Sequence, residues 1–118
     1  MDEGDRGRQK MRSIKEIDGL LLRIKNHLVS TYKTGIKYLI LYGSFGRGEA
    51  TEKSDIDILV VVDDRIDPRQ VEENLSDLLF EILLEHGELI SVIVVKESIF
   101  EGYKSPLFLN VKEEGVII

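Results

Sequence analysis

The sequence predicts a small α/β sandwich, because helical and strand-like apolar patterns alternate along a chain of single-domain length. Its 118 residues suffice for one hydrophobic core and are too few for two. The expected order of elements is helix, strand, strand, helix, strand, helix. We expect a flexible polar tail over residues 1–12 and a single domain over residues 13–118.

The first half of this domain is expected to hold one long helix and two strands. Ser13 and Glu16 have the spacing of a capping box, and apolar residues then recur at helical spacing as far as Tyr32. The first predicted strand is Ile36–Tyr42. A second, nearly continuous apolar run opens at Ser54 or Asp55 and reaches about Val62, which predicts a central strand covered on both faces.

Residues typical of helix caps mark the helices in the second half of the predicted domain. Asp67 and Pro68 place an N-cap before a proline at the first helical position, and Gly87 is a natural end for the helix that follows. Ser105 and Pro106 repeat this pattern for another helix. The sequence also predicts three short elements: a strand at Leu89–Val95, a helical segment at Glu97–Tyr103 and a final strand at Val116–Ile118.

Two acidic residues at the start of the second strand form the centre of a candidate site. Asp55 and Asp57 lie two residues apart, so their side chains share one face of the strand. Two carboxylates on one face repel each other, and a cation between them would relieve that repulsion. Mg2+ prefers carboxylate oxygens and keeps positions open for substrate phosphates. Taken alone, the pair could also be a turn cap and a solvent-facing edge residue.

A glycine-rich turn precedes the carboxylates and suits the phosphates of a nucleotide. Gly43 lets the backbone come close, Ser44 offers a hydroxyl, and Arg47 offers a planar cationic fork. Two better-known phosphate loops do not fit. Gly43 and Gly48 have P-loop spacing, but Glu49 stands where that loop needs lysine, and the last small residue of a dinucleotide fingerprint is missing. The pattern favours a Mg2+–triphosphate site.

The combined motif resembles the nucleotidyltransferase signature of the DNA polymerase β superfamily. It reads Gly-Ser-Phe-Gly-Arg-Gly-Glu from Gly43 and Ser-Asp-Ile-Asp-Ile-Leu-Val from Ser54. In this form it is most similar to the minimal nucleotidyltransferases, an antitoxin-like branch, over roughly Ile14 to Ile118. The resemblance implies the polymerase-β-like nucleotidyltransferase fold, an α+β arrangement in which helices pack on a small mixed sheet.

The same resemblance implies an activity and a set of roles. A minimal nucleotidyltransferase would use Mg2+ to move a nucleoside monophosphate, here AMP from ATP, onto a hydroxyl acceptor. The implied acceptor is a tyrosine of a small helical partner of the higher-eukaryote-and-prokaryote nucleotide-binding (HEPN) kind. Asp55 and Asp57 would be the catalytic metal ligands, and Gly43, Ser44 and Arg47 would bind the phosphates.

One position departs from the family pattern. The family carries a third carboxylate on a later strand, and the matching position here is Ser91, which cannot act as a carboxylate base. Glu88 is the only nearby acid and lies on the opposite face under strict alternation. Two hypotheses therefore stay open: an active transferase, or a catalytically impaired module that binds a nucleotide or a partner.

Composition excludes several other classes of protein. A net charge of −6 argues against stable nucleic-acid binding. A basic cluster near the N-terminus (Arg6, Arg8, Lys10, Arg12) is interpreted as part of a solvated tail, with a nucleic-acid-binding arm as the alternative. The absence of cysteine excludes disulfides and thiolate metal sites and is consistent with the cytoplasm. We expect no signal peptide and no membrane helix. The small size favours a partner chain, while the acceptor, the nucleotide and the oligomeric state stay open.

Overall fold

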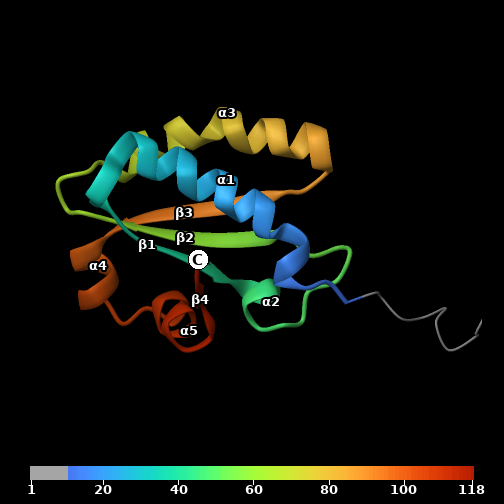
Figure 1. Ribbon diagram of the computed structural model, residues 1–118. Coiled ribbons are helices and arrows are strands. Elements are labelled where there is room, and N and C mark those ends of the chain that lie inside the picture. Colours follow the sequence, from blue (N-terminus) through green and yellow to red (C-terminus); the bar gives the residue numbers. More distant parts are fainter. Residues whose placement is uncertain (1–10) are drawn as a thin grey trace, which may run out of the picture.

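The computed structural model describes residues 11–118, in which a four-stranded mixed sheet lies between two layers of helices (Figure 1). The strand order is β3-β2-β1-β4. The central strand β1 pairs antiparallel with both β2 and β4, and β2 pairs parallel with β3. These strands are β1 (Ile36–Tyr42), β2 (Ile56–Val62), β3 (Ile90–Lys96) and β4 (Val116–Ile117). The expected mixed sheet packed by helices is confirmed.

The two helical layers differ in length. The long helices α1 (Ile14–Tyr32) and α3 (Pro68–His86) lie on one face of the sheet, and the shorter α4 (Glu97–Gly102) and α5 (Pro106–Glu114) lie on the other (Figure 1). Side chains of β2 alternate between the layers. The side toward α1 and α3 is fully buried along the whole strand: Ile56, Ile58, Val60 and Val62. The side toward α4 and α5 carries two further buried residues, Leu59 and Val61.

The caps expected for the later helices are present. The Asp67 carboxylate accepts a hydrogen bond from the backbone N–H of Arg69 at 3.0 Å, at the start of α3. That helix ends at Gly87, whose φ of 68° lies in the left-handed region that glycine adopts without strain. The Ser105 hydroxyl accepts a hydrogen bond from the N–H of Phe108 at 3.1 Å and begins α5.

Some local predictions were wrong in detail. The Ser13 side chain makes no capping hydrogen bond at the start of α1. The Glu16 carboxylate instead lies 3.4 Å from the Arg12 guanidinium, so the expected capping box does not form. The strands β2 and β3 begin at Ile56 and Ile90, slightly later than expected. Two short helical segments were not predicted: the 3-10 turn η2 (Lys33–Gly35) and the single turn α2 (Gly43–Gly46).

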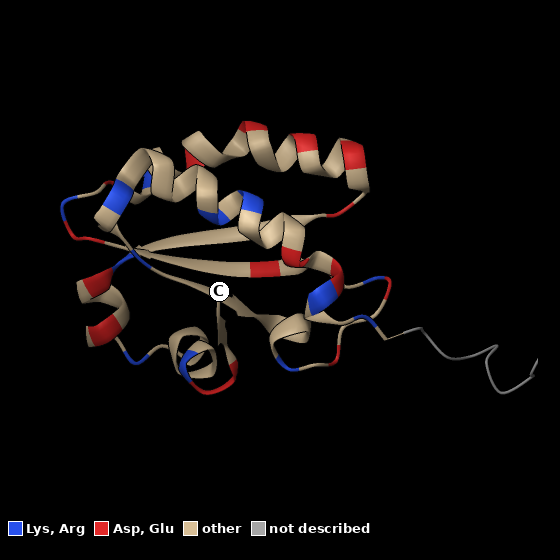
Figure 2. Ribbon diagram, viewed as in Figure 1, with Lys and Arg blue, Asp and Glu red and all other residues tan. Residues whose placement is uncertain are grey.

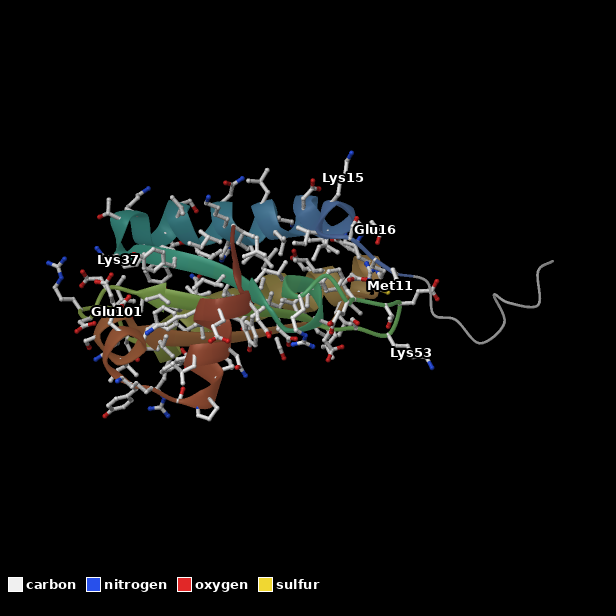
Figure 3. The ribbon with its side chains drawn as sticks, turned by 90° about the horizontal axis from the view of Figure 1, so that it is seen from below. Met11, Lys15, Glu16, Lys37, Lys53 and Glu101 are labelled. Atoms are coloured by element: carbon white, nitrogen blue, oxygen red, sulfur yellow. The ribbon has the colours of Figure 1, made fainter. Side chains whose placement is uncertain are left out.

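Met11 and Arg12, the described residues before α1, are hydrogen-bonded to the loop that precedes β2. Met11 forms an isolated antiparallel bridge with Thr51, and the Arg12 N–H donates to the Ala50 carbonyl at 2.8 Å. Seen from below, Met11 lies at the same end of the molecule as Lys53 (Figure 3). The expected tail included Met11 and Arg12, and its remaining residues 1–10, with most of the basic cluster, lie outside the described residues. No helix within residues 11–118 is both long and apolar enough to span a membrane.

Candidate active site

The start of β2 sets the position of the two aspartates. Ile56 and Ile58 are fully buried against α1 and α3, so Asp57 between them faces the opposite side of the sheet. Asp57 is half-buried, and Asp55, just before the strand, is exposed. Asp57 is the only acidic residue of β2, and Figure 2 shows the acidic colour close to where the strand begins.

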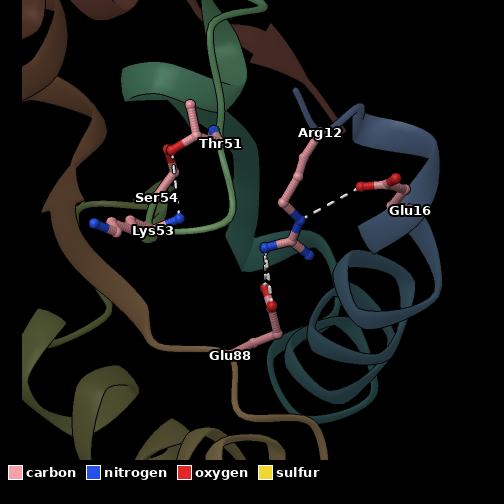
Figure 4. A network of polar contacts seen from close by, with 6 residues as sticks. All are labelled: Arg12, Glu16, Thr51, Lys53, Ser54 and Glu88. Carbon is pink, nitrogen blue, oxygen red and sulfur yellow. Dashed lines mark hydrogen bonds and ion pairs between the residues drawn. The ribbon is translucent and has the colours of Figure 1, made fainter. Parts of the chain in front are cut away.

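A short turn fixes the chain just before Asp55. The backbone N–H of Thr51 donates to the Ser54 hydroxyl at 2.9 Å, and the Ser54 N–H donates to the Thr51 carbonyl at 3.0 Å. The Thr51 hydroxyl also accepts from the N–H of Lys53 at 3.3 Å (Figure 4). These local bonds give the loop a defined route into β2.

The glycine-rich turn lies directly against Asp57. Tyr42, the last residue of β1, is the cross-strand partner of Asp57. Gly43 follows with a φ of 68°, a conformation that a residue with a side chain adopts only with strain. A Cβ atom at this position would collide with the Asp57 carboxylate. Glycine is therefore required both by the backbone conformation and by the close approach of Asp57.

The α2 turn presents Ser44 and buries Phe45. The Arg47 N–H donates to the Gly43 carbonyl at 3.0 Å, and the Glu49 N–H donates to the Ser44 carbonyl at 2.8 Å, so the turn is closed by its own backbone. Phe45 is 1% exposed and anchors the turn in the core, while Ser44 is partly exposed. Because Ser44 is partly exposed, its hydroxyl is accessible to a ligand.

Arg47 follows the turn and is paired with carboxylates. Its guanidinium lies 3.1 Å from Glu49 and 3.8 Å from Glu114 of α5, and its side chain is 41% exposed. Pairs this exposed contribute little to stability and exchange readily. A phosphate group, which also accepts the guanidinium fork, can therefore compete with these glutamates for Arg47.

The electrostatics of the site indicate an excess of negative charge. Partial burial and the neighbouring charge of Asp55 raise the pKa of Asp57, and the positive charge of Arg47 opposes this shift. Partial burial and the charge of Asp57 likewise raise the pKa of Tyr42. Tyr42 therefore lies beside the site. The fold thus holds Asp57 where its ionised form lacks full compensation.

The structure places Ser91, the residue expected at the third acidic position, next to Asp57. Ser91 of β3 is the parallel cross-strand partner of Asp57 and is exposed. Glu88 does not replace it, because its carboxylate lies 3.0 Å from the Arg12 guanidinium. Within the described residues, His, Cys, Asp and Glu side chains form no group of three or more that could hold a metal. Among the described residues, the starts of β2 and β3 therefore offer the carboxylates of Asp55 and Asp57 and the hydroxyl of Ser91.

Arg12 is the residue at this end of the molecule that sequence reasoning missed. It was assigned to the tail because it belongs to a run of polar and basic residues. No local pattern indicates its contacts, since Glu88 lies 76 positions away in the sequence. Only the tertiary structure brings the two together.

The family of the protein follows from comparison with known domains. A family model described as a nucleotidyltransferase domain matches residues 21–114, which include the glycine-rich turn, both aspartates and Ser91. The chain belongs to the nucleotidyltransferase domain family. The resemblance inferred from the motif is thereby confirmed.

The nucleotidyltransferase is similar to several proteins of Methanocaldococcus jannaschii. It is 42% identical over 94 residues to the one named "Putative protein adenylyltransferase MJ0604", a match that covers 79% of this chain and 88% of the relative. A second protein of that organism with the same kind of name, MJ1379, is 38% identical over 94 residues, with the same 79% and 88% coverage.

Solved structures share the fold at low sequence identity. One is described as a "putative minimal nucleotidyltransferase" and has a TM-score of 0.54 at 22% identity, covering 86% of this chain and 95% of that one. Another, a toxin–antitoxin structure with AMP-PNP, has a TM-score of 0.53 at 18% identity, covering 80% and 69%. At these identities the likeness concerns the fold alone.

Proposed function

We propose that this nucleotidyltransferase moves AMP from ATP onto a hydroxyl group of a protein, with Mg2+ held by Asp55 and Asp57. The observation that carries the proposal is the close approach of Gly43 to Asp57, which brings the glycine-rich turn against the carboxylate pair. The family supports nucleotidyl transfer as the reaction class. The names of the relatives, protein adenylyltransferases, support AMP as the group and a protein as the acceptor.

The residues present fit a divalent cation bound together with a triphosphate. Hard cations prefer carboxylate oxygens, and Mg2+ commonly takes one or two carboxylates and completes its shell with water and phosphate oxygens. Asp57 has a raised pKa and an acidic neighbour, so a nearby cation would favour its ionised form. Because Gly43 has no Cβ, the Asp57 carboxylate can lie directly against the backbone of the glycine-rich turn. When bound, the ion would neutralise charge on the phosphate oxygens.

The other site residues would bind and orient the nucleotide. Ser44 would donate its hydroxyl to a phosphate oxygen, and Arg47 would exchange its glutamate partners for the β or γ phosphate. In the reaction, the acceptor oxygen bonds to the α phosphorus, and the bond from that phosphorus to the α–β bridging oxygen breaks. Pyrophosphate leaves, and the acceptor proton passes to water. Ser91 would hold a water beside Asp57, in place of a carboxylate base.

We further propose that the acceptor is a tyrosine of a HEPN-type helical partner, in an antitoxin-like pair. The proposal is supported by a structural neighbour described as a toxin–antitoxin structure with AMP-PNP, an ATP analogue. ATP as donor and the absence of cysteine fit a cytoplasmic location. In this proposal a partner chain or a second copy supplies the acceptor surface.

A second function, nucleotide or partner binding without efficient transfer, is favoured by one observation. Ser91, which stands where the family resemblance implies a third carboxylate, is the cross-strand partner of Asp57, and Glu88 is bound to Arg12. General-base assistance is worth roughly 100- to 10,000-fold in rate, so its loss would leave slow transfer.

Calorimetric titration of ATP into the purified protein, with and without Mg2+, tests the site before the acceptor is known. Saturable binding that needs Mg2+ and is lost in Asp57→Asn is the expected result. Absence of binding to the unaltered protein would contradict the proposal. Labelled ATP is then supplied to the protein with a co-purified partner. Label that reaches the partner, but not with Asp57→Asn, supports transfer; nucleotide binding without any label supports the binding function.

A further inference from the structure

Arg12 joins three segments at the end of the molecule that carries the candidate site. Its guanidinium lies 3.0 Å from Glu88, which precedes β3, and 3.4 Å from Glu16 in the first turn of α1 (Figure 4). The same group lies over the ring of Phe45, 5.3 Å from the ring centroid. We call Arg12, Glu88 and Phe45 the Arg12 clamp.

Within the clamp, the ion pair between Arg12 and Glu88 is the most buried one in the described part of the chain. The side chains of Arg12 and Glu88 are 18% and 16% exposed, less than those of the other ion pairs among residues 11–118. A charge pair with little solvent around it is screened weakly and holds a defined geometry. The planar guanidinium can bind a carboxylate at its edge and an aromatic ring at its face at the same time, which lysine cannot do.

Each contact of the clamp fixes a segment next to a candidate site residue. Phe45 directly follows Ser44, so a guanidinium over its ring restrains the turn that presents the Ser44 hydroxyl. Besides these side-chain contacts, the backbone N–H of Arg12 donates to the Ala50 carbonyl at 2.8 Å, which places residue 12 beside the loop that leads to Asp55 whatever its side chain. Glu88 begins the segment that leads to Ser91 of β3, and the Ile56 N–H donates to the adjacent Leu89 carbonyl at 3.0 Å.

We propose that Arg12 is a positioning residue of the nucleotide site: it holds the glycine-rich turn in its binding conformation through Phe45 and Glu88, without touching the nucleotide. This inference rests on the proposed function, because it concerns the same phosphate-binding turn. It also gives Glu88 a role, as the anchor of Arg12 and not as the third metal ligand.

Arg23 offers a matched comparison within the same molecule. It lies on α1 and also pairs with two carboxylates, Glu81 at 3.2 Å and Glu85 at 3.1 Å, both on α3. It thus joins two elements by the same chemistry, but it contacts neither the glycine-rich turn nor the loop before Asp55. Substitution of Arg23 therefore reports the loss of a double ion pair alone.

The test compares Arg12→Lys with Arg23→Lys in the full chain. Each variant is titrated with ATP plus Mg2+ and, separately, with adenosine, which lacks phosphates. We expect Arg12→Lys to weaken ATP binding by about tenfold, because the turn must then be ordered on binding, and to leave adenosine binding unchanged. Arg23→Lys is expected to alter neither. Equal loss for both ligands, or equal effects of the two variants, would overturn the positioning role.

Hydrogen exchange on the nucleotide-free protein separates this inference from the proposed function. Amides of residues 43–54 should exchange faster in Arg12→Lys than in the unaltered protein or in Arg23→Lys. Glu88→Gln, which keeps the shape but removes the charge, should produce the same pattern. If the unaltered protein binds no ATP, the proposed function fails, while equal exchange in the Arg12→Lys and Arg23→Lys proteins overturns the clamp itself.

Discussion

The two sides of β2 are built from one strand, yet only one of them is closed along its whole length. Toward α1 and α3, the alternate residues from Ile56 to Val62 are all fully buried. Toward α4 and α5, Leu59 and Val61 are equally buried, but Asp57 at the start of the strand is only half-buried. The second layer is short and stops before it covers this end of the sheet.

This difference leaves the side chain at position 57 accessible to solvent and to a ligand. An apolar side chain at position 57 would need a longer α5 or a partner to cover it, and burial of such a side chain is worth about 1.5–3 kcal/mol. The protein instead places a carboxylate there, next to Asp55, in surroundings that raise its pKa. The closed side supplies the stability that lets the open side hold like charges together.

The largest expected effect on activity comes from Asp57 on the open side of β2, compared with its neighbour Ile58 on the closed side. Asp57→Asn should lower the rate of AMP transfer by about 1,000-fold. It removes a charged ligand of the proposed Mg2+ ion, which would stabilise the phosphate charge of the transition state by several kcal/mol. Ile58→Val, one position further on the closed side, should cost about 1 kcal/mol of stability and leave transfer nearly intact. Transfer of labelled AMP and thermal unfolding measure the two quantities. Equal activity of the two variants would remove Asp57 from the site.

A second prediction adds charge to the open side instead of removing it. Ser91→Asp places a carboxylate opposite Asp57, and if a missing base limits the reaction, transfer should rise by about 100-fold. Ser91→Asn is the matched control, since it has nearly the same shape and no charge. A gain with both variants would indicate a packing effect. No gain with Ser91→Asp would mean that serine and water already suffice, or that the protein is not built for transfer.

The comparison of the two sides of β2 also explains how much of the fold and of the candidate site could be predicted from the sequence. The closed side follows from local patterns: strand periodicity, the Asp67 cap and the Gly87 helix end are all set by residues near in sequence. The Gly43 turn and the aspartate pair could also be predicted, because they are a contiguous motif. The Arg12 contact could not, since its partner Glu88 is far away along the chain and both look like surface charges in the sequence.

A third prediction separates backbone strain from contact with the site. Gly43 and Gly87 have the same φ of 68°, so alanine at either position should cost about 1–2 kcal/mol of strain. Only at Gly43 does the added Cβ collide with Asp57, while at Gly87 it meets open space. Gly43→Ala should therefore weaken Mg2+-dependent ATP binding by about tenfold beyond Gly87→Ala, which should leave it unchanged. Equal affinities, measured by calorimetry, would show that the Gly43 contact does not shape the site.

The smallest expected effect concerns stability and pH. Partial burial and the charge of Asp55 raise the pKa of Asp57 in the folded protein, so its ionisation disfavours folding. Folding stability should fall as the pH rises from the ordinary aspartate pKa through the raised one. Asp57→Asn removes this penalty and should stabilise the metal-free protein at neutral pH, by less than about 1 kcal/mol because the group is half-exposed. Below the ordinary pKa the difference should vanish.

Thermal unfolding of both proteins between acid and neutral pH measures this difference in stability. The same measurement with added Mg2+ tests whether Asp57 binds a cation. A cation beside Asp57 would favour the ionised form, so Mg2+ should raise the melting temperature of the unaltered protein and not that of Asp57→Asn. If Asp57→Asn were the less stable protein at neutral pH without metal, Asp57 would be a structural carboxylate. The open side of β2 would then owe its charge to folding and not to a ligand.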